Sequence, residues 1–130
     1  MSGLLQRLAT VLGPVAEVIE EYDDALTVRH DDTVASFRVV TLSDELELVS
    51  LTQILAWDLP LTADTRQRVS EQTAATLLGT VALVPDPAGK SADAMLRYTF
   101  PAAGLSDDAL RMLVLVVLSS GANVRSALAP

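Results

Sequence analysis

The chain has 130 residues, of which 50% are hydrophobic and 20% are charged, so we expect a folded single domain over residues 1–130. It contains no cysteine, which excludes disulfides, thiolate zinc sites and cysteine nucleophiles. Its net charge of -8 argues against direct binding to nucleic acid, whose phosphates are also negative.

The N-terminal segment predicts a short amphipathic helix. Ser2 is a suitable N-cap, and Gly13 with Pro14 marks the end of the helix. One face of this helix collects four leucines, at positions 4, 5, 8 and 12. The segment 15–24 carries conflicting signals, because its apolar spacing fits a helix and its β-branched residues fit a strand; we favour a short strand.

Three strands are expected next. Segments 25–30 and 33–42 both alternate between apolar and polar residues, and the two aspartates between them favour a hairpin turn. The run 46–57 is a third strand whose alternation changes phase near Ser50, which suggests a bulge or a break. Pro60 lacks a backbone donor and is expected to follow the end of this strand.

The middle of the chain predicts a helix and a second hairpin. The helix covers 63–77, with Thr62 as N-cap and Gly79 as the stop signal. Segment 80–84 is almost entirely apolar, which is typical of an interior strand covered on both faces. Segment 94–100 alternates and pairs with it across a turn.

The last helix is expected over 107–119, capped by Ser106. The whole pattern predicts an α+β fold, an antiparallel sheet flanked by helices, in the order α-β-β-β-(β)-α-β-β-α. Leu110 to Leu118 contain one residue that is not apolar, Arg111. This run is too short for a membrane span of about 20 residues, so we expect a buried helix.

Nine helical residues point in every direction around the helix axis, and one sheet cannot cover them all. Two explanations remain open. Neighbouring helices and the segment 123–130 cover the far side within one chain, or a second subunit or partner does so. In the second case the predicted interface residues are Leu113, Val114, Val116 and Val117.

No residue pattern indicates catalysis, a metal site or a cofactor. His30 is the only histidine and is expected to be an exposed structural residue in a hairpin. The run 89–91, Gly-Lys-Ser, lacks the earlier glycine of a phosphate-binding loop and is expected to form a plain turn. Adjacent acidic pairs fall at predicted turns and helix caps. The chain is therefore not expected to be an enzyme.

Trp57 follows an apolar strand and has two interpretations. It packs at the edge of the core, or it lines an apolar ligand pocket between the sheet and the helices together with Phe100. The second interpretation makes a small-molecule carrier or sensor the alternative function.

The order of elements resembles that of the YbjN family, described as sensory transduction regulators with a fold similar to type III secretion chaperones. The resemblance covers about residues 3–121. It rests on "AWDLPL", "TADTRQRVSEQTAATLLG", "TVALVPDPAGKSADAMLRYTF" and "GLSDDALRMLVLVVL". It implies a small, acidic, non-enzymatic protein that dimerises and binds another protein, and it supplies no catalytic residues.

The leading hypothesis is a non-enzymatic protein-binding module, chaperone-like or regulatory, that associates through its apolar C-terminal helix. We expect a homodimer with a protein client or regulatory partner, and neither nucleic acid nor membrane as a partner. The first residues lack the basic segment of a secretory signal, so a cytoplasmic location is expected.

Overall fold

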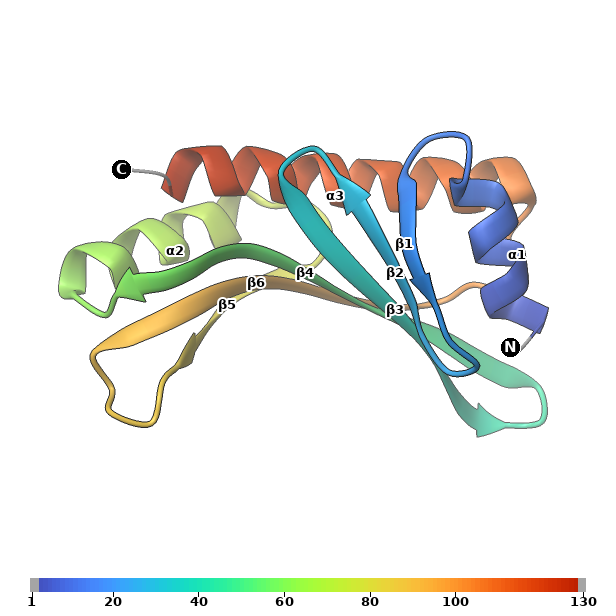
Figure 1. Ribbon diagram of the computed structural model, residues 1–130, viewed down its shortest axis with the longest axis horizontal. Helices are drawn as coiled ribbons and strands as arrows, with labels where there is room; N and C mark the ends of the chain where they lie inside the picture. Colours follow the sequence, from blue (N-terminus) through green and yellow to red (C-terminus); the bar gives the residue numbers. More distant parts are fainter. Residues whose placement is uncertain (1–2, 129–130) are drawn as a thin grey trace.

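The computed structural model describes residues 3–128 and contains one antiparallel sheet with three helices (Figure 1). In chain order the elements are α1 (Gly3–Leu12), β1 (Glu17–Glu21), β2 (Leu26–His30), β3 (Thr33–Ser43), β4 (Leu46–Pro60), α2 (Ala63–Ala75), β5 (Thr80–Pro85), β6 (Ser91–Pro101) and α3 (Asp107–Leu128). The predicted α+β class and order are confirmed, and the fourth strand left in brackets is present.

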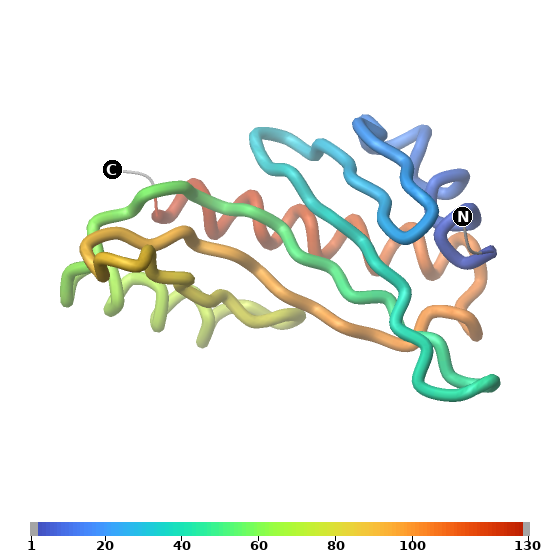
Figure 2. Tube along the Cα trace, turned by 60° about the horizontal axis from the view of Figure 1, so that its bottom comes forward, coloured from blue at the N-terminus to red at the C-terminus, as the bar shows by residue number. Residues whose placement is uncertain are grey.

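The sheet has six strands in the order β1-β2-β3-β4-β6-β5, and every neighbouring pair is antiparallel. β4 is the longest strand, with 15 residues, and pairs with β3 on one side and β6 on the other. The tip of the β3–β4 hairpin extends past the rest of the sheet (Figures 1 and 2).

The helices lie on one side of the sheet (Figure 1). α3 crosses the strands, α1 packs against one end of α3, and α2 packs beside β5 (Figure 2). Alternation along the strands sends one set of side chains toward the helices. The largest fully buried ones on the strands include Leu26, Phe37, Leu51, Leu55 and Leu96. The other set points away from every helix.

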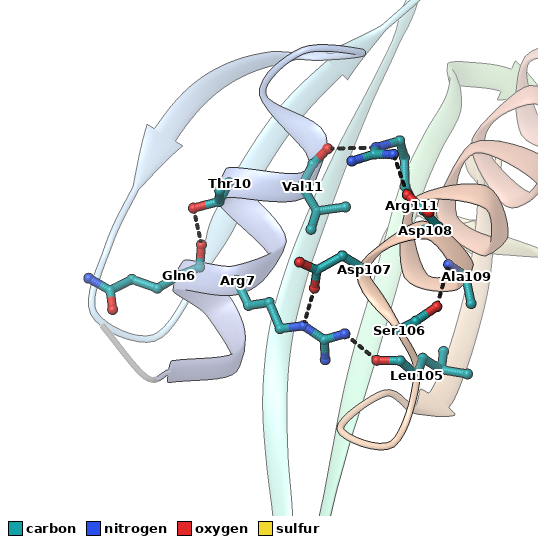
Figure 3. Close-up of polar contacts among 10 residues, drawn as sticks. All are labelled: Gln6, Arg7, Thr10, Val11, Leu105, Ser106, Asp107, Asp108, Ala109 and Arg111. Carbon is teal, nitrogen blue, oxygen red and sulfur yellow. Dashed lines mark hydrogen bonds and ion pairs between the residues drawn. The ribbon is translucent and has the colours of Figure 1, made fainter.

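Polar contacts join α1 to the start of α3 (Figure 3). The Arg7 guanidinium donates to Asp107 Oδ1 at 2.6 Å and to the carbonyl oxygen of Leu105. On the next turn, Arg111 Nε donates to the carbonyl oxygen of Val11 at 3.3 Å. The two carbonyl groups lie outside regular helix bonding, so these arginines satisfy acceptors that would otherwise need water.

α3 begins as expected and ends nine residues later than expected, at Leu128 instead of position 119. Ser106 Oγ accepts from the backbone N–H of Ala109 at 3.1 Å, as an N-cap does (Figure 3). Gly121 does not stop the helix. A Cβ built on Gly121 would overlap the side-chain amide of Gln53, so glycine is needed there for close packing of α3 on β4.

Gln53 is a buried polar side chain beneath α3. Its Nε2 donates to Thr33 Oγ1 at 2.7 Å and to the carbonyl oxygen of Leu118 at 3.1 Å. Within residues 3–128 its Oε1 has no hydrogen-bond partner. The amide therefore ties β3, β4 and α3 together at the point where the helix lies nearest the sheet.

The short strand favoured for segment 15–24 is confirmed as β1, while other sequence-based boundaries need correction. The predicted helix 63–77 ends at Ala75. β4 keeps its register past Ser50, and its irregularities lie between Ile54 and Leu59. β5 is an edge strand on which only Val81 is buried, so the prediction of an interior strand covered on both faces was wrong: Ala82, Leu83 and Val84 are only partly buried.

α3 has the length and composition of a membrane-crossing helix: it has 22 residues, and an 18-residue window within it has a mean hydropathy of 1.2. This similarity is weak evidence for a membrane span, because the buried core helix of a soluble protein meets the same criteria. One side of α3 packs into the core, and the buried residues are Leu110, Val114, Val117, Leu118, Gly121, Val124 and Leu128.

Candidate binding surfaces

The four predicted interface residues on α3 do not share one surface. Val114 and Val117 are fully buried in the core, so a partner cannot reach them while the helix is packed. Leu113 is partly buried against the same core, and Val116 is 42% exposed. Met112, which the prediction omitted, is 64% exposed one turn before Val116. The surface that α3 leaves accessible is thus smaller than expected.

The far side of α3 is not covered by the C-terminal segment, because residues 123–128 continue the helix. α1 covers part of its first half. His30 is partly buried, not exposed as expected, and lies 3.6 Å from the carboxylate of Asp31. Gly89 and Lys90 lie in the turn between β5 and β6, as predicted, and Ser91 begins β6. In this turn the backbone N–H of Lys90 donates to Asp86 Oδ1 at 3.0 Å.

Trp57 and Phe100 do not line a common pocket. Phe100 is buried in the core, opposite Val49 in the sheet, with its ring stacked on Tyr98 at 5.2 Å between centroids. Trp57 is 65% exposed near the far end of β4. The interpretation of Trp57 as core packing is therefore wrong, and its proposed pairing with Phe100 is wrong as well.

An irregular stretch of β4 carries Trp57. Pairing with β6 shifts on either side of Ala56 and resumes at Leu59. Asp58 has a φ of 53°, in the left-handed region that non-glycine residues rarely occupy, and its N–H donates to Asp93 Oδ1 at 3.0 Å. Bulges of this kind redirect a side chain from the sheet.

Three adjacent cavities surround the last turn of α3. The largest, about 510 Å³, is lined by Trp57 together with Asp32, Ala56, Leu59, Arg125, Ser126 and Leu128. A second, about 250 Å³, shares Leu59 and Leu128 with it and reaches α2. A third, about 370 Å³, shares Asp32, Arg125 and Ser126 and reaches the β2–β3 turn. We call the largest the Trp57 cavity.

The side of the sheet away from the helices carries an apolar row across four strands. Cross-strand pairing puts Ile54 beside both Val34 and Met95, and Met95 beside Ala82. These side chains are half buried or exposed, whereas their sequence neighbours on the helix side are buried. We call this side of β3, β4, β5 and β6 the open face.

A polar band lies next to the apolar row on the open face. Two rungs of the sheet form it: Ser36 with Thr52 and Arg97, and Arg38 with Ser50 and Thr99. The two arginines stand two strands apart, about 10 Å across the sheet and about 7 Å along it, close enough to contact one bound group. In the described part of the chain neither forms an ion pair with a carboxylate within 4.0 Å.

The open face was missed because strand neighbours far apart in sequence create it. Alternation in β3 already places Val34, Arg38 and Val40 on one side. Nothing in the sequence says that β4 lies between β3 and β6, and that adjacency is what assembles the row and the band.

The chain resembles a known protein in its fold and not in its sequence. The sequence matches no protein-family model and no curated protein. It is similar in structure to YbjN from E. coli, described as a candidate transcription regulator, with a TM-score of 0.61 over 93% of this chain and 87% of that chain. The chain has the fold of YbjN. At 16% identity the likeness to YbjN concerns the fold alone, and the predicted resemblance is confirmed at that level.

Proposed function

We propose that this protein is a non-enzymatic regulatory module that acts by binding another protein, and that the open face of its sheet is the main binding surface. The observation that carries the proposal is the arrangement of all three helices on one side, which leaves apolar side chains in register across four strands without cover. Contiguous apolar surface of this kind marks interaction sites.

The charges on the open face indicate the chemistry of the partner. The protein is strongly acidic, yet the charged side chains of the polar band are Arg38 and Arg97. The carboxylate on the other side of Met95, that of Asp93, accepts from the backbone N–H of Asp58. A partner surface that combines apolar side chains with carboxylates complements both the row and the band. Two copies stacked symmetrically would bring like arginines together, so we assign the face to a different, acidic protein.

The likeness to YbjN supports a regulatory role, since that protein is described as a candidate transcription regulator. Regulation through direct contact with DNA is disfavoured here by the net charge of -8. Chaperone-like activity, a homodimer and a cytoplasmic location remain predictions. For the homodimer, Met112 and Val116 are the accessible apolar residues of α3.

Matched charge substitutions test which surface binds. The immobilised wild-type protein is exposed to cytosol of its own cells, beside an Ile54→Glu variant of the open face and a Met112→Glu variant of α3. We expect Met112→Glu to retain the same protein as the wild type. Ile54→Glu should retain at most about a tenth as much, because it places a carboxylate in the apolar row opposite an acidic partner.

Circular dichroism of both variants checks that each keeps its fold. Loss of the retained protein with Met112→Glu, and not with Ile54→Glu, would move the binding surface to α3 and contradict the proposal. Failure of the wild type to retain any protein would also count against it.

A further inference from the structure

We infer that the Trp57 cavity binds a small zwitterionic molecule with an apolar side group, of the chemical class of an apolar α-amino acid or a short peptide made from such residues. This inference is independent of the open face and concerns the opposite side of the sheet. Four features carry it: the volume of the cavity, its apolar wall, its two opposite charges, and the strained strand that presents Trp57.

The volume and the apolar wall suit a small organic molecule. About 510 Å³ lies within the usual range of ligand pockets, which are mainly apolar with a few polar groups that fix orientation. Leu59 and Leu128 contribute aliphatic surface, and Trp57 contributes an indole ring that is 65% exposed. Exposure of so large an aromatic ring costs free energy that a bound apolar group would recover.

The Trp57 cavity is lined by two opposite charges that do not form an ion pair with each other. Arg125 and Asp32 both line the Trp57 cavity, yet no ion pair of 4.0 Å or less joins them within residues 3–128. Arg125 Nη1 donates to the carbonyl oxygen of Leu55 at 2.6 Å, which fixes the guanidinium and leaves further donors. A ligand carboxylate suits Arg125, and a ligand ammonium suits Asp32.

Arg125 differs in this respect from Arg7 and Arg111, the two arginines where α1 meets the start of α3. Arg7 and Arg111 each donate to a carbonyl oxygen and also pair with a carboxylate, Asp107 and Asp108 respectively. Arg125 makes the carbonyl contact alone. Asp31 and Asp32 line the third cavity together with Arg125, but neither forms an ion pair with it within 4.0 Å in the described residues, so a ligand carboxylate would supply that pairing.

The backbone of β4 beside the cavity departs from regular strand geometry. The register with β6 shifts beside Ala56, and Asp58 adopts a left-handed conformation that costs free energy, in the stretch where Ala56 and Trp57 line the cavity. Strain of this kind is maintained where it positions a functional side chain.

Fluorescence of Trp57, the one tryptophan in the chain, reports binding directly. The full-length protein is titrated with phenylalanine and with a phenylalanine dipeptide, which separate a free amino acid from a peptide. N-acetylphenylalanine, which has no ammonium group, and phenylalanine amide, which has no carboxylate, are the matched probes. We expect the fluorescence of Trp57 to change saturably with at least one of the two zwitterions, with a Kd near or below about 1 mM. Both matched probes, each of which lacks one charge, should bind at least about tenfold more weakly.

Substitutions test whether Arg125 and Asp32 bind the two charged groups of the ligand. Arg125→Gln and Asp32→Asn should each weaken the zwitterion at least about tenfold, while Arg111→Gln, a matched loss at the other end of α3, should leave binding unchanged. Calorimetry of folded Trp57→Leu should show weaker binding as well. Equal binding of zwitterion and matched probes, insensitivity to Arg125→Gln and Asp32→Asn, or no fluorescence change with any probe would each overturn the inference.

Discussion

Replacing Gly121 with alanine will lower the free energy of unfolding by at least about 2 kcal/mol, although helix propensity alone predicts a gain of about 1 kcal/mol. The new methyl group would overlap the Gln53 amide, which is fully buried and cannot move into solvent. Overpacking costs about 1–3 kcal/mol, and displacing Gln53 also breaks its bonds to Thr33 and Leu118. Urea unfolding measures the change.

A double-mutant cycle isolates the cause. Gln53→Ala removes the obstructing amide, so adding Gly121→Ala to that background should be neutral or stabilising, with a coupling free energy of about 2 kcal/mol or more. Gly104 has no atom within 4 Å of a built Cβ, and Gly104→Ala should change stability by less than about 0.5 kcal/mol. Equal effects at Gly121 and Gly104 would show that α3 does not lie this close to β4.

Val117→Asp will destabilise the protein by more than about 4 kcal/mol and leave much of it unfolded or insoluble. Val117 is fully buried between α3 and the sheet, where an aspartate would have no cationic partner and would lose its hydration. Chemical denaturation and the yield of soluble protein measure the effect.

The neighbouring Val116→Asp is the matched control, with the same substitution one residue earlier on the same helix. Val116 is 42% exposed, so its change should stay within about 0.5 kcal/mol. A stable Val117→Asp variant would mean that Val117 faces solvent or a partner, as the sequence alone suggested, and would contradict the packing of α3 described above.

Local patterns were enough to predict most of the fold. Alternation in β2, β3 and β6 and the capping residues Thr62 and Ser106 mark elements that the structure contains. The errors arose where a residue has two physical roles. A glycine after an apolar run, such as Gly121, predicts the end of a helix. Here the small size of Gly121 allows close contact with Gln53, a residue 68 positions away that no local pattern connects to it.

The candidate surfaces were harder to predict, because they depend on contacts between distant segments. The apolar run in α3 contains both buried and exposed residues. Val117 is buried and Val116 is exposed because the sheet lies on one side of the helix, and the position of the sheet cannot be predicted from the run itself. Trp57 was recognised as a candidate ligand residue, but the cavity that it lines includes Arg125 from α3 and not Phe100. The irregular pairing of β4 beside Trp57 has no clear signal in the sequence.

Methionine oxidation of the complex tests whether the protein binds its partner through the open face. Met95 lies in the apolar row of the open face and Met112 on the exposed side of α3, so the two residues report on opposite surfaces. With the protein retained from cytosol bound, we expect the oxidation rate of Met95 to fall several-fold and that of Met112 to stay unchanged. Protection of Met112 with unchanged oxidation of Met95 would contradict binding through the open face.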